Sequence, residues 1–224
     1  MPKEINKPLL FEIEAPDFAG KTTLINNLKK AMKNKTHSFF SEDKFEFFRL
    51  PGSTPFSEKC RALIKQYKTN PISSAALAFA AQMDFYKTLE SKSFNKNIIL
   101  DRGLLSFIVY QGYLTNFVDA DHEYYNCLYD RLKDQIDKQF KRYVIFLSIS
   151  DEEYLNRRAS RSKNSKEDIY DDLAYSEKIR NGYNWAVKNL GYPPSINYIL
   201  DANKLPNEMT KNALNFIKSK TNDQ

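Results

Sequence analysis

The residues of this chain that are best suited to chemistry lie in one short loop, a Gly-Lys-Thr-Thr segment at residues 20–23 that follows an apolar run at residues 9–13. In such a loop the backbone N–H groups, with those at the start of the following helix, point toward a bound anion. Lys21 reaches the β- and γ-phosphates of a nucleotide, and the Thr22 hydroxyl ligates Mg²⁺. The pattern predicts a phosphate loop over residues 14–23 and a nucleotide as its ligand.

The elements on either side of this loop support that interpretation. Ala15 stands where the full pattern G-x-x-x-x-G-K-[ST] has its first glycine, so the first turn must accommodate a Cβ. The segment before the loop has the composition of a strand, and the segment after it carries apolar residues at helical spacing. These residues are Leu24, Ile25, Leu28 and Ala31. A strand, a loop and a helix in this order are the context that the motif requires.

Charged residues also lie at the carboxyl ends of two other predicted strands. Asp101 and Arg102 come directly after the run at 98–100, and Arg49 lies at the end of the run at 46–50. In an open α/β sheet the carboxyl ends of the strands line the ligand crevice. Asp101 is suited to hold Mg²⁺ or to orient an acceptor group, and Arg102 offers a rigid fork to phosphate oxygens. The alternatives are a structural Asp–Arg ion pair and, for Arg49, an ordinary surface charge.

A basic segment begins near the end of a predicted helix at 151–158. Arg157, Arg158, Arg161 and Lys163 lie within seven residues, at the start of a polar stretch without apolar periodicity, residues 160–168. Such a cluster suits a lid that closes over a triphosphate, because arginine compensates the charge of the transferred phosphoryl group. A solvated basic face is the alternative interpretation.

The chain alternates between apolar runs and segments with helical periodicity, which predicts an α/β fold with a parallel sheet and crossover helices. The predicted strands are residues 9–13, 46–50, 98–100, 143–147 and 197–200. The predicted helices are residues 21–35, 57–67, 73–89, 104–114, 122–139, 151–158, 172–190 and 206–218. A chain of 224 residues fits one large domain, here residues 1–224.

Composition narrows the classes of function. The formal net charge is +6 and the pI is near 9.1, but Lys and Arg are interspersed with Asp and Glu, which favours small anionic ligands over nucleic acid. Cys60 and Cys127 lie far apart, and His37 and His122 are isolated, so neither a disulfide framework nor a zinc site is indicated. No apolar run approaches about 18 residues, and we expect a cytoplasmic protein with no membrane or nucleic-acid partner.

Several segments between residues 9 and 217 resemble those of thymidylate kinases and occur in that family's order. The most specific is DRGLLSFIVYQG at 101–112, which resembles their D-R-Y-x-x-S-x-x-A-Y-Q-G. RLPGST at 49–54 resembles R-E-P-G-G-T, and LAFAA at 77–81 resembles L-L-F-A-A. The other matches are EKCR at 58–61 for E-x-I-R, Arg157 and Arg161 for the lid arginines, RNGY at 180–183 for the helix after the lid, and LDANK at 200–204 for the I-D-A loop near the adenine.

The resemblance implies a P-loop nucleoside-monophosphate kinase fold, a five-stranded parallel sheet flanked by helices with a small lid at about residues 157–170. It implies transfer of the ATP γ-phosphate to a deoxynucleoside monophosphate, with dTMP as the first choice of acceptor, Mg²⁺ as the metal and a homodimer as the assembly. The alternative is a related kinase with shifted specificity, for dUMP, another dNMP or a free deoxynucleoside. A P-loop GTPase or binding protein is disfavoured, because we find no N-K-x-D motif.

The resemblance also assigns roles to residues. On the donor side it assigns Ala19, Gly20, Lys21, Thr22, Thr23, Arg157 and Ala202. On the acceptor side it assigns Asp17, Arg49, Phe79, Met83, Arg102, Ser106, Tyr110 and Gln111. Its catalytic residues are Lys21, Asp101, Arg102, Arg157 and Arg161, and its metal ligands are Thr22 and Asp101.

Within these roles Phe79 would stack on the base and Tyr110 would crowd the 2′ position, which favours deoxyribose. Phe18 stands where one branch of the family has a phosphate-loop arginine, so the catalytic positive charge should come from the lid. We do not expect Lys21 to be buried, so that Lys21→Ala should abolish transfer without disturbing the fold.

Two departures concern the base pocket. Met83 stands in the place of the arginine that reads the thymine carbonyl, with Gln82 before it in place of an aspartate, and Phe107 occupies a position that is often polar in relatives. These departures predict looser base selectivity, with dUMP accepted, and a sharper preference for dTMP in a Met83→Arg variant.

Overall fold

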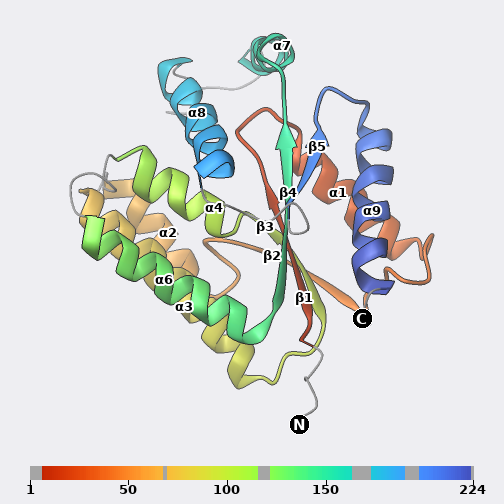
Figure 1. Ribbon diagram of the computed structural model, residues 1–224, viewed down its shortest axis with the longest axis horizontal. Helices are drawn as coiled ribbons and strands as arrows, with labels where there is room; N and C mark the ends of the chain where they lie inside the picture. Colours follow the sequence, from red (N-terminus) through yellow and green to blue (C-terminus); the bar gives the residue numbers. More distant parts are fainter. Residues whose placement is uncertain (1–6, 68–69, 116–121, 163–172, 190–196, 223–224) are drawn as a thin grey trace.

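The computed structural model of the chain describes residues 7–67, 70–115, 122–162, 173–189 and 197–222 (Figure 1). Its strands form a five-stranded sheet in the order β2-β3-β1-β4-β5, and every neighbouring pair is parallel. The strands are β1 (Leu9–Glu14), β2 (Phe45–Arg49), β3 (Asn97–Asp101), β4 (Lys141–Ser148) and β5 (Asn197–Asp201). The predicted five-stranded parallel sheet is confirmed, with the strand before the phosphate loop at its centre.

Helices cover both faces of this sheet. In Figure 1, α1 and α9 lie on one side, and α2, α3, α6 and α8 lie on the other. The helices are α1 (Lys21–Lys33), α2 (Pro55–Tyr67), α3 (Pro71–Ser91), α4 (Leu104–Phe107), the π-helix η1 (Ile108–Tyr113), α6 (His122–Gln139), α7 (Asp151–Ser162), α8 (Leu173–Asn189) and α9 (Pro206–Asn222). Among the described residues, no helix combines the length and apolar character that a bilayer crossing needs.

Most helix ends differ from the predicted ends for local reasons. Helix α3 starts earlier than predicted, because Pro71 suits the first turn and the Asn70 side chain accepts a hydrogen bond from the Ser73 N–H at 2.9 Å. The helix predicted over 104–114 is instead the short α4 followed by η1, and π-turns of this kind often mark functional sites. Helix α7 runs to Ser162, so the polar stretch at 160–168 begins as helix. The rest of that stretch, and the lid beyond Ser162, fall outside the described residues.

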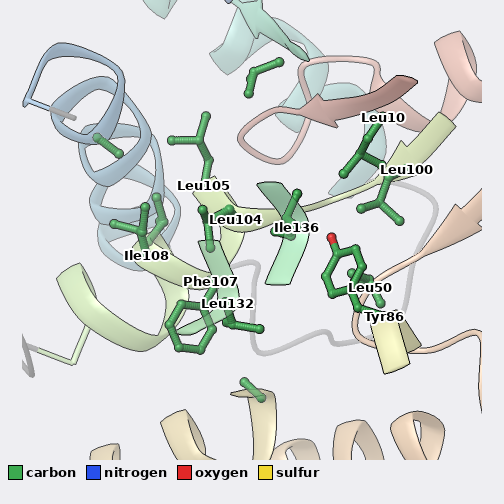
Figure 2. Packing of buried hydrophobic residues seen from close by; sticks show 14 of the residues in the cluster. Leu10, Leu50, Tyr86, Leu100, Leu104, Leu105, Phe107, Ile108, Leu132 and Ile136 are labelled. Atoms are coloured by element: carbon green, nitrogen blue, oxygen red, sulfur yellow. The ribbon is translucent and has the colours of Figure 1, made fainter. Parts of the chain in front are cut away.

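Alternation along β1 divides the core in two. Leu9, Phe11 and Ile13 pack with α1 and α9, in a cluster that contains stacked Phe11 and Tyr143 rings 5.5 Å apart. Leu10 faces the other side, where it packs with residues of α3, α4, η1 and α6 (Figure 2). Since successive strand residues point to opposite faces, Glu12 and Glu14 also lie on this second side.

Glu12 is an acid inside the apolar core. It is completely buried, its closest cation is Arg142 at 3.9 Å, and Oε1 finds no hydrogen-bond partner among the described residues. Burial raises the pKa of Glu12 to about 7. Gly103 packs directly on this carboxyl group, and a Cβ at position 103 would lie 2.3 Å from the Glu12 Cδ. The buried acid therefore requires glycine at that point of the chain.

We predict that Glu12→Gln makes the free energy of unfolding less dependent on pH. The folded pKa of about 7 lies above the ordinary value of 4.5, so the folded state holds the proton more tightly and stability falls as pH rises between these values. The difference corresponds to roughly 3 kcal/mol. Urea unfolding should show Glu12→Gln close to wild type near about pH 5 and more stable than wild type near about pH 8.

Glu46→Gln, on the half-buried strand β2, is the matched control for the replacement of a glutamate by glutamine. An equal pH slope for wild type and Glu12→Gln would show that the carboxyl group is ionised in the fold despite its burial.

Candidate active site

One cavity of about 790 Å³ opens at the carboxyl ends of the central strands. Its walls come from the phosphate loop, the start of α1, the loop after β2, and helices α2, α3, α4, η1, α7 and α9. Twelve of the residues predicted for the site line it, namely Asp17, Gly20, Lys21, Thr22, Thr23, Arg49, Asp101, Arg102, Ser106, Tyr110, Gln111 and Arg157. Residues far apart in the sequence are thus brought to one concave surface.

The phosphate loop has the backbone geometry of an anion cradle. Gly20 has φ +86° and directly precedes α1, whose first turn contains no acidic residue. A Cβ on Gly20 would lie 3.2 Å from Nη1 of Arg157, so the loop and α7 approach closely there. Ala15 is buried and is not among the described residues with positive φ, so the loop accommodates its Cβ. The free N–H groups at this helix start suit a phosphate.

Phe18 fixes the other side of the loop. It has φ +63°, and its ring meets Tyr154 of α7 edge to face at 5.6 Å. Non-glycine residues rarely adopt positive φ, so packing against Tyr154 helps to hold this turn.

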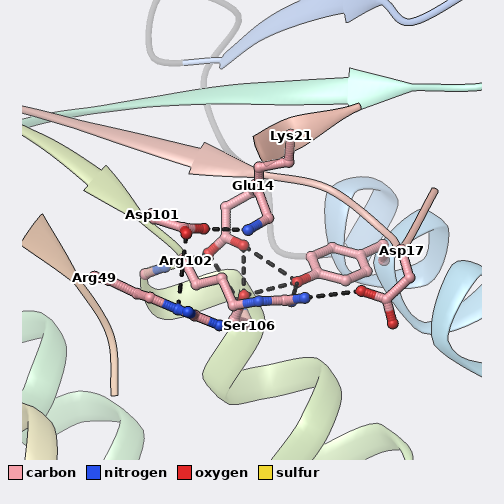
Figure 3. A network of polar contacts seen from close by, with 9 residues as sticks. Glu14, Asp17, Lys21, Arg49, Asp101, Arg102 and Ser106 are labelled. Carbon is pink, nitrogen blue, oxygen red and sulfur yellow. Dashed lines mark hydrogen bonds and ion pairs between the residues drawn. The ribbon is translucent and has the colours of Figure 1, made fainter. Parts of the chain in front are cut away.

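Lys21 is less exposed than the sequence led us to expect. Its side chain is only 10% exposed and forms an ion pair with Asp101, and Asp101 also lies 3.8 Å from Nε of Arg49 (Figure 3). Burial and the nearby charge of Arg102 lower the pKa of Lys21, and Asp101 opposes this shift. Lys21 is thus neither fully buried nor exposed, because the strand-end carboxylate draws the ammonium group inward. Removing Lys21 would also leave Asp101 without its closest cation.

Glu14, the last residue of β1, organises the turn that carries Arg102. Its fully buried carboxylate accepts hydrogen bonds from the Gly103 N–H at 2.7 Å, the Ser106 N–H at 3.0 Å and the Ser106 hydroxyl at 2.6 Å. The Tyr183 hydroxyl of α8 donates to the same carboxylate at 3.3 Å and lies 2.7 Å from the Ser106 hydroxyl. The Gly103 and Ser106 N–H groups belong to the N-terminal end of α4, where a negative charge also suits the helix dipole.

Arg102 is held on three sides. Nη1 donates to the Tyr183 hydroxyl and Nη2 to Asp17, each at 3.0 Å, and the guanidinium lies 5.0 Å from the centre of the Tyr110 ring. Its backbone has φ +68°, and its N–H donates to the Ile13 carbonyl at 3.2 Å. The arginine is therefore fixed in one orientation toward the cavity.

The roles of Glu14 and Tyr183 in this site were not predicted from the sequence, although Glu14 begins the predicted phosphate loop. A signal was present for Glu14, because acids at positions 12 and 14 interrupt an otherwise apolar central strand. Such acids are rarely fully buried unless they are paired or hydrogen-bonded. Tyr183 carries no comparable signal, since only the packing of α8 brings its hydroxyl to Arg102.

Arg157 links α7 to the phosphate loop and to the loop after β5. Its Nε donates to Glu153 and its Nη2 to the Ala202 carbonyl, each at 2.6 Å. Ala202 is buried and is not among the described lining residues of the cavity, so its link to the site is this carbonyl contact with Arg157. Arg161 follows Arg157 by one helical turn in α7, but its side chain lies outside what the structure describes.

Helix α3 turns a different face to the cavity from the one predicted. Ala78 and Gln82 line it, whereas Phe79 and Met83 are not among its described lining residues and pack against the core cluster of Figure 2. Ala19, also predicted for the site, is buried beneath the phosphate loop. The structure thus places Phe79 and Met83 outside the described lining of the cavity, and their roles toward the base stay predictions.

Comparisons with known proteins agree with this geometry. Residues 13–212 match the family model described as thymidylate kinase. The chain belongs to the thymidylate kinase family. The thymidylate kinase of Malacoplasma penetrans (strain HF-2) is 29% identical over 173 residues, which cover 76% of this chain and 75% of the relative. That of Mycoplasma genitalium (strain G37) is 34% identical over 110 residues, 48% of this chain and 50% of the relative.

The crystal structure of thymidylate kinase from Ehrlichia chaffeensis has the same fold, with a TM-score of 0.62 at 20% identity over 95% of this chain and 99% of that chain. As a member of the thymidylate kinase family, the chain is a nucleoside-monophosphate kinase that transfers a phosphoryl group from ATP.

We predict that Tyr183→Phe destabilises the fold, while Tyr86→Phe does not. Both side chains are fully buried, but the Tyr183 hydroxyl contacts Glu14, Ser106 and Arg102, whereas the Tyr86 hydroxyl has no hydrogen-bond partner among the described residues. Removing one member of a buried network costs about 1–3 kcal/mol, whereas removing an unpartnered hydroxyl costs close to nothing. Urea unfolding of both variants measures the difference, and equal losses would contradict the proposed role of Tyr183.

Proposed function

We propose that this chain transfers the γ-phosphate of ATP to the 5′-phosphate of dTMP and so forms dTDP. The observation that carries the proposal is that two pairs of cationic side chains line one cavity. Lys21 and Arg157 lie at the phosphate loop, and Arg49 and Arg102 lie at the ends of β2 and β3. Phosphoryl transfer between two phosphorylated substrates needs cations on both sides of the transferred group, with the reactants held in line.

The acceptor-side arginines distinguish this proposal from the alternative of a deoxynucleoside kinase. Arg49 is 54% exposed, so its guanidinium is accessible to a phosphate. Arg102 is held by Asp17 and Tyr183 in the cavity wall, where a phosphate can replace or join these partners. A free 5′-hydroxyl would offer these two arginines no phosphate to bind. Cations in this position are useful when the acceptor already carries a phosphate.

The oxygen ligands at the donor end suit Mg²⁺. Thr22 is exposed at the start of α1 and lines the cavity with Asp101, and a hydroxyl and a carboxylate are hard ligands of the kind that Mg²⁺ prefers. We assign Thr22 and Asp101 to the ion, with Asp101 acting directly or through water. When bound, the ion would neutralise phosphate charge, while Lys21 and the loop N–H groups orient the β- and γ-phosphates.

We also propose a homodimer. Phe56 and Leu63 of α2 and Ile72 of α3 are large apolar side chains that are 49%, 41% and 50% exposed, and α2 and α3 pack against each other. An apolar surface of this kind suits a second copy of the chain. Sedimentation of wild type and of a Leu63→Glu variant tests it, since only the variant should be monomeric.

A coupled ADP-release assay tests the main proposal. Purified protein is given ATP, Mg²⁺ and one of a panel of dNMPs, NMPs and free nucleosides, with Lys21→Ala as the inactive control. Highest kcat/KM with dTMP supports the proposal. A free nucleoside as the best acceptor would replace it with the nucleoside-kinase alternative.

We predict that Arg49→Ala raises the KM for dTMP and leaves the KM for ATP nearly unchanged. Arg49 lies on the acceptor side, and a charge-assisted hydrogen bond contributes about 1.5–3 kcal/mol, which is roughly a 10- to 150-fold change. Steady-state kinetics with each substrate varied in turn provide the measurement. Arg131→Ala, on the exposed face of α6, is the control. A matching rise in the KM for ATP would move Arg49 to the donor side.

We predict that Arg157→Ala lowers kcat far more than it raises the KM for dTMP. An arginine that neutralises the transferred phosphoryl group contributes about 10³–10⁵ in rate. Arg161→Ala should act in the same direction, and the two changes should combine less than additively if both side chains close on one phosphate. Arg158→Ala is the control on the same helix. A loss of only a few-fold in kcat would limit Arg157 to its structural contacts with Glu153 and Ala202.

A further inference from the structure

Gln82 is a polar side chain of the cavity wall that the protein leaves unsatisfied. The residue is 3% exposed and lines the cavity, and Oε1 has no hydrogen-bond partner among the described residues. A buried amide oxygen without a partner destabilises a fold, so its presence in a cavity wall indicates that a ligand supplies the partner.

The position of Gln82 follows from the face that α3 turns to the cavity. Ser74, Ala78 and Gln82 follow one another at intervals of four residues and so share a face of the helix. Ala78 and Gln82 both line the cavity, one helical turn apart. Met83 packs against the core instead, so Gln82 is the polar group that this turn of α3 offers to a ligand.

A second amide in the same wall has a fixed orientation. The Ser74 hydroxyl donates to Oε1 of Gln111 at 2.6 Å, and Gln111 of η1 also lines the cavity. Since its oxygen is already engaged, Gln111 offers its NH₂ group as a donor. The wall between α3 and η1 therefore combines an unpaired acceptor on Gln82 with a donor on Gln111.

These two amides complement the edge of a thymine base, in which an N3–H donor lies between two carbonyl acceptors. We infer that Gln82 reads this edge, with Oε1 accepting from N3–H and Nε2 donating to one carbonyl, while Gln111 donates to the other. The inference rests on the proposed function and names the residue that selects its base. An arginine at this site could only donate, whereas a carboxamide also accepts the N3–H hydrogen bond.

The first test pairs Gln82→Met with Gln135→Met. Gln82→Met keeps the volume and removes both hydrogen-bonding groups, so kcat/KM for dTMP and dUMP should fall by about 10- to 100-fold. The melting temperature should stay equal or rise, because an unpartnered buried oxygen is removed. Gln135→Met makes the same replacement at a buried glutamine of α6 that is not among the described lining residues of the cavity, and it should alter kcat/KM less than about threefold. A purely structural role for Gln82 would instead lower the melting temperature and spare kcat/KM.

The second test changes the substrate rather than the protein. With dTMP methylated at N3, the donor is absent, so wild-type kcat/KM should fall by at least about tenfold. The ratio of wild type to Gln82→Met, about 10–100 with dTMP, should be clearly smaller with this analogue, because only the Nε2 hydrogen bond to a carbonyl remains to be lost. Equal wild-type turnover of dTMP and the analogue overturns the inference and leaves the proposed function intact. Wild-type inactivity with every dNMP would instead overturn the proposed function.

Discussion

Glu14 ends the central strand with a buried carboxylate, and its hydrogen bonds reach the turn after β3, the start of α4 and, through Tyr183, helix α8. A buried charge without such donors would cost several kcal/mol, so the fold must bring these segments together. The turn thus formed places Arg102 in a left-handed conformation and aims its guanidinium at the cavity. Glu14 therefore fixes the acceptor side of the site relative to the rest of the phosphate loop.

The cations of the site are oriented before any substrate is present. Lys21 and Arg49 share Asp101, and Arg102 contacts Asp17 and Tyr183 (Figure 3). A phosphate that enters replaces or joins these partners without a rearrangement of the backbone. Oriented charges of this kind stabilise a transferred phosphoryl group at little cost in reorganisation. The same carboxylates keep the cations from repelling one another in the fold.

The sequence was sufficient for the features that depend on strong local signals. Apolar runs predicted the five parallel strands, and Lys21, Arg49 and Asp101 were placed together because the carboxyl ends of parallel strands meet at one edge. The burial of Lys21 was not predictable in this way, because it depends on where the Asp101 side chain points. The division of the helix at 104–114 into α4 and η1 also depends on tertiary packing, since α8 lies so close to η1 that a Cβ on Gly182 would meet Tyr113 at 2.8 Å.

The departures from the family's motifs are best understood through their contacts. Gly103 stands where the D-R-Y motif has tyrosine, and the carboxyl group of Glu12 occupies the space that a Cβ would need. A motif match also does not fix which side chains of α3 reach the cavity, because adjacent residues differ in direction by about 100° around a helix. Met83 packs against the core cluster, whereas the preceding Gln82 lines the cavity. Base selection in this kinase then depends on a carboxamide that both donates and accepts.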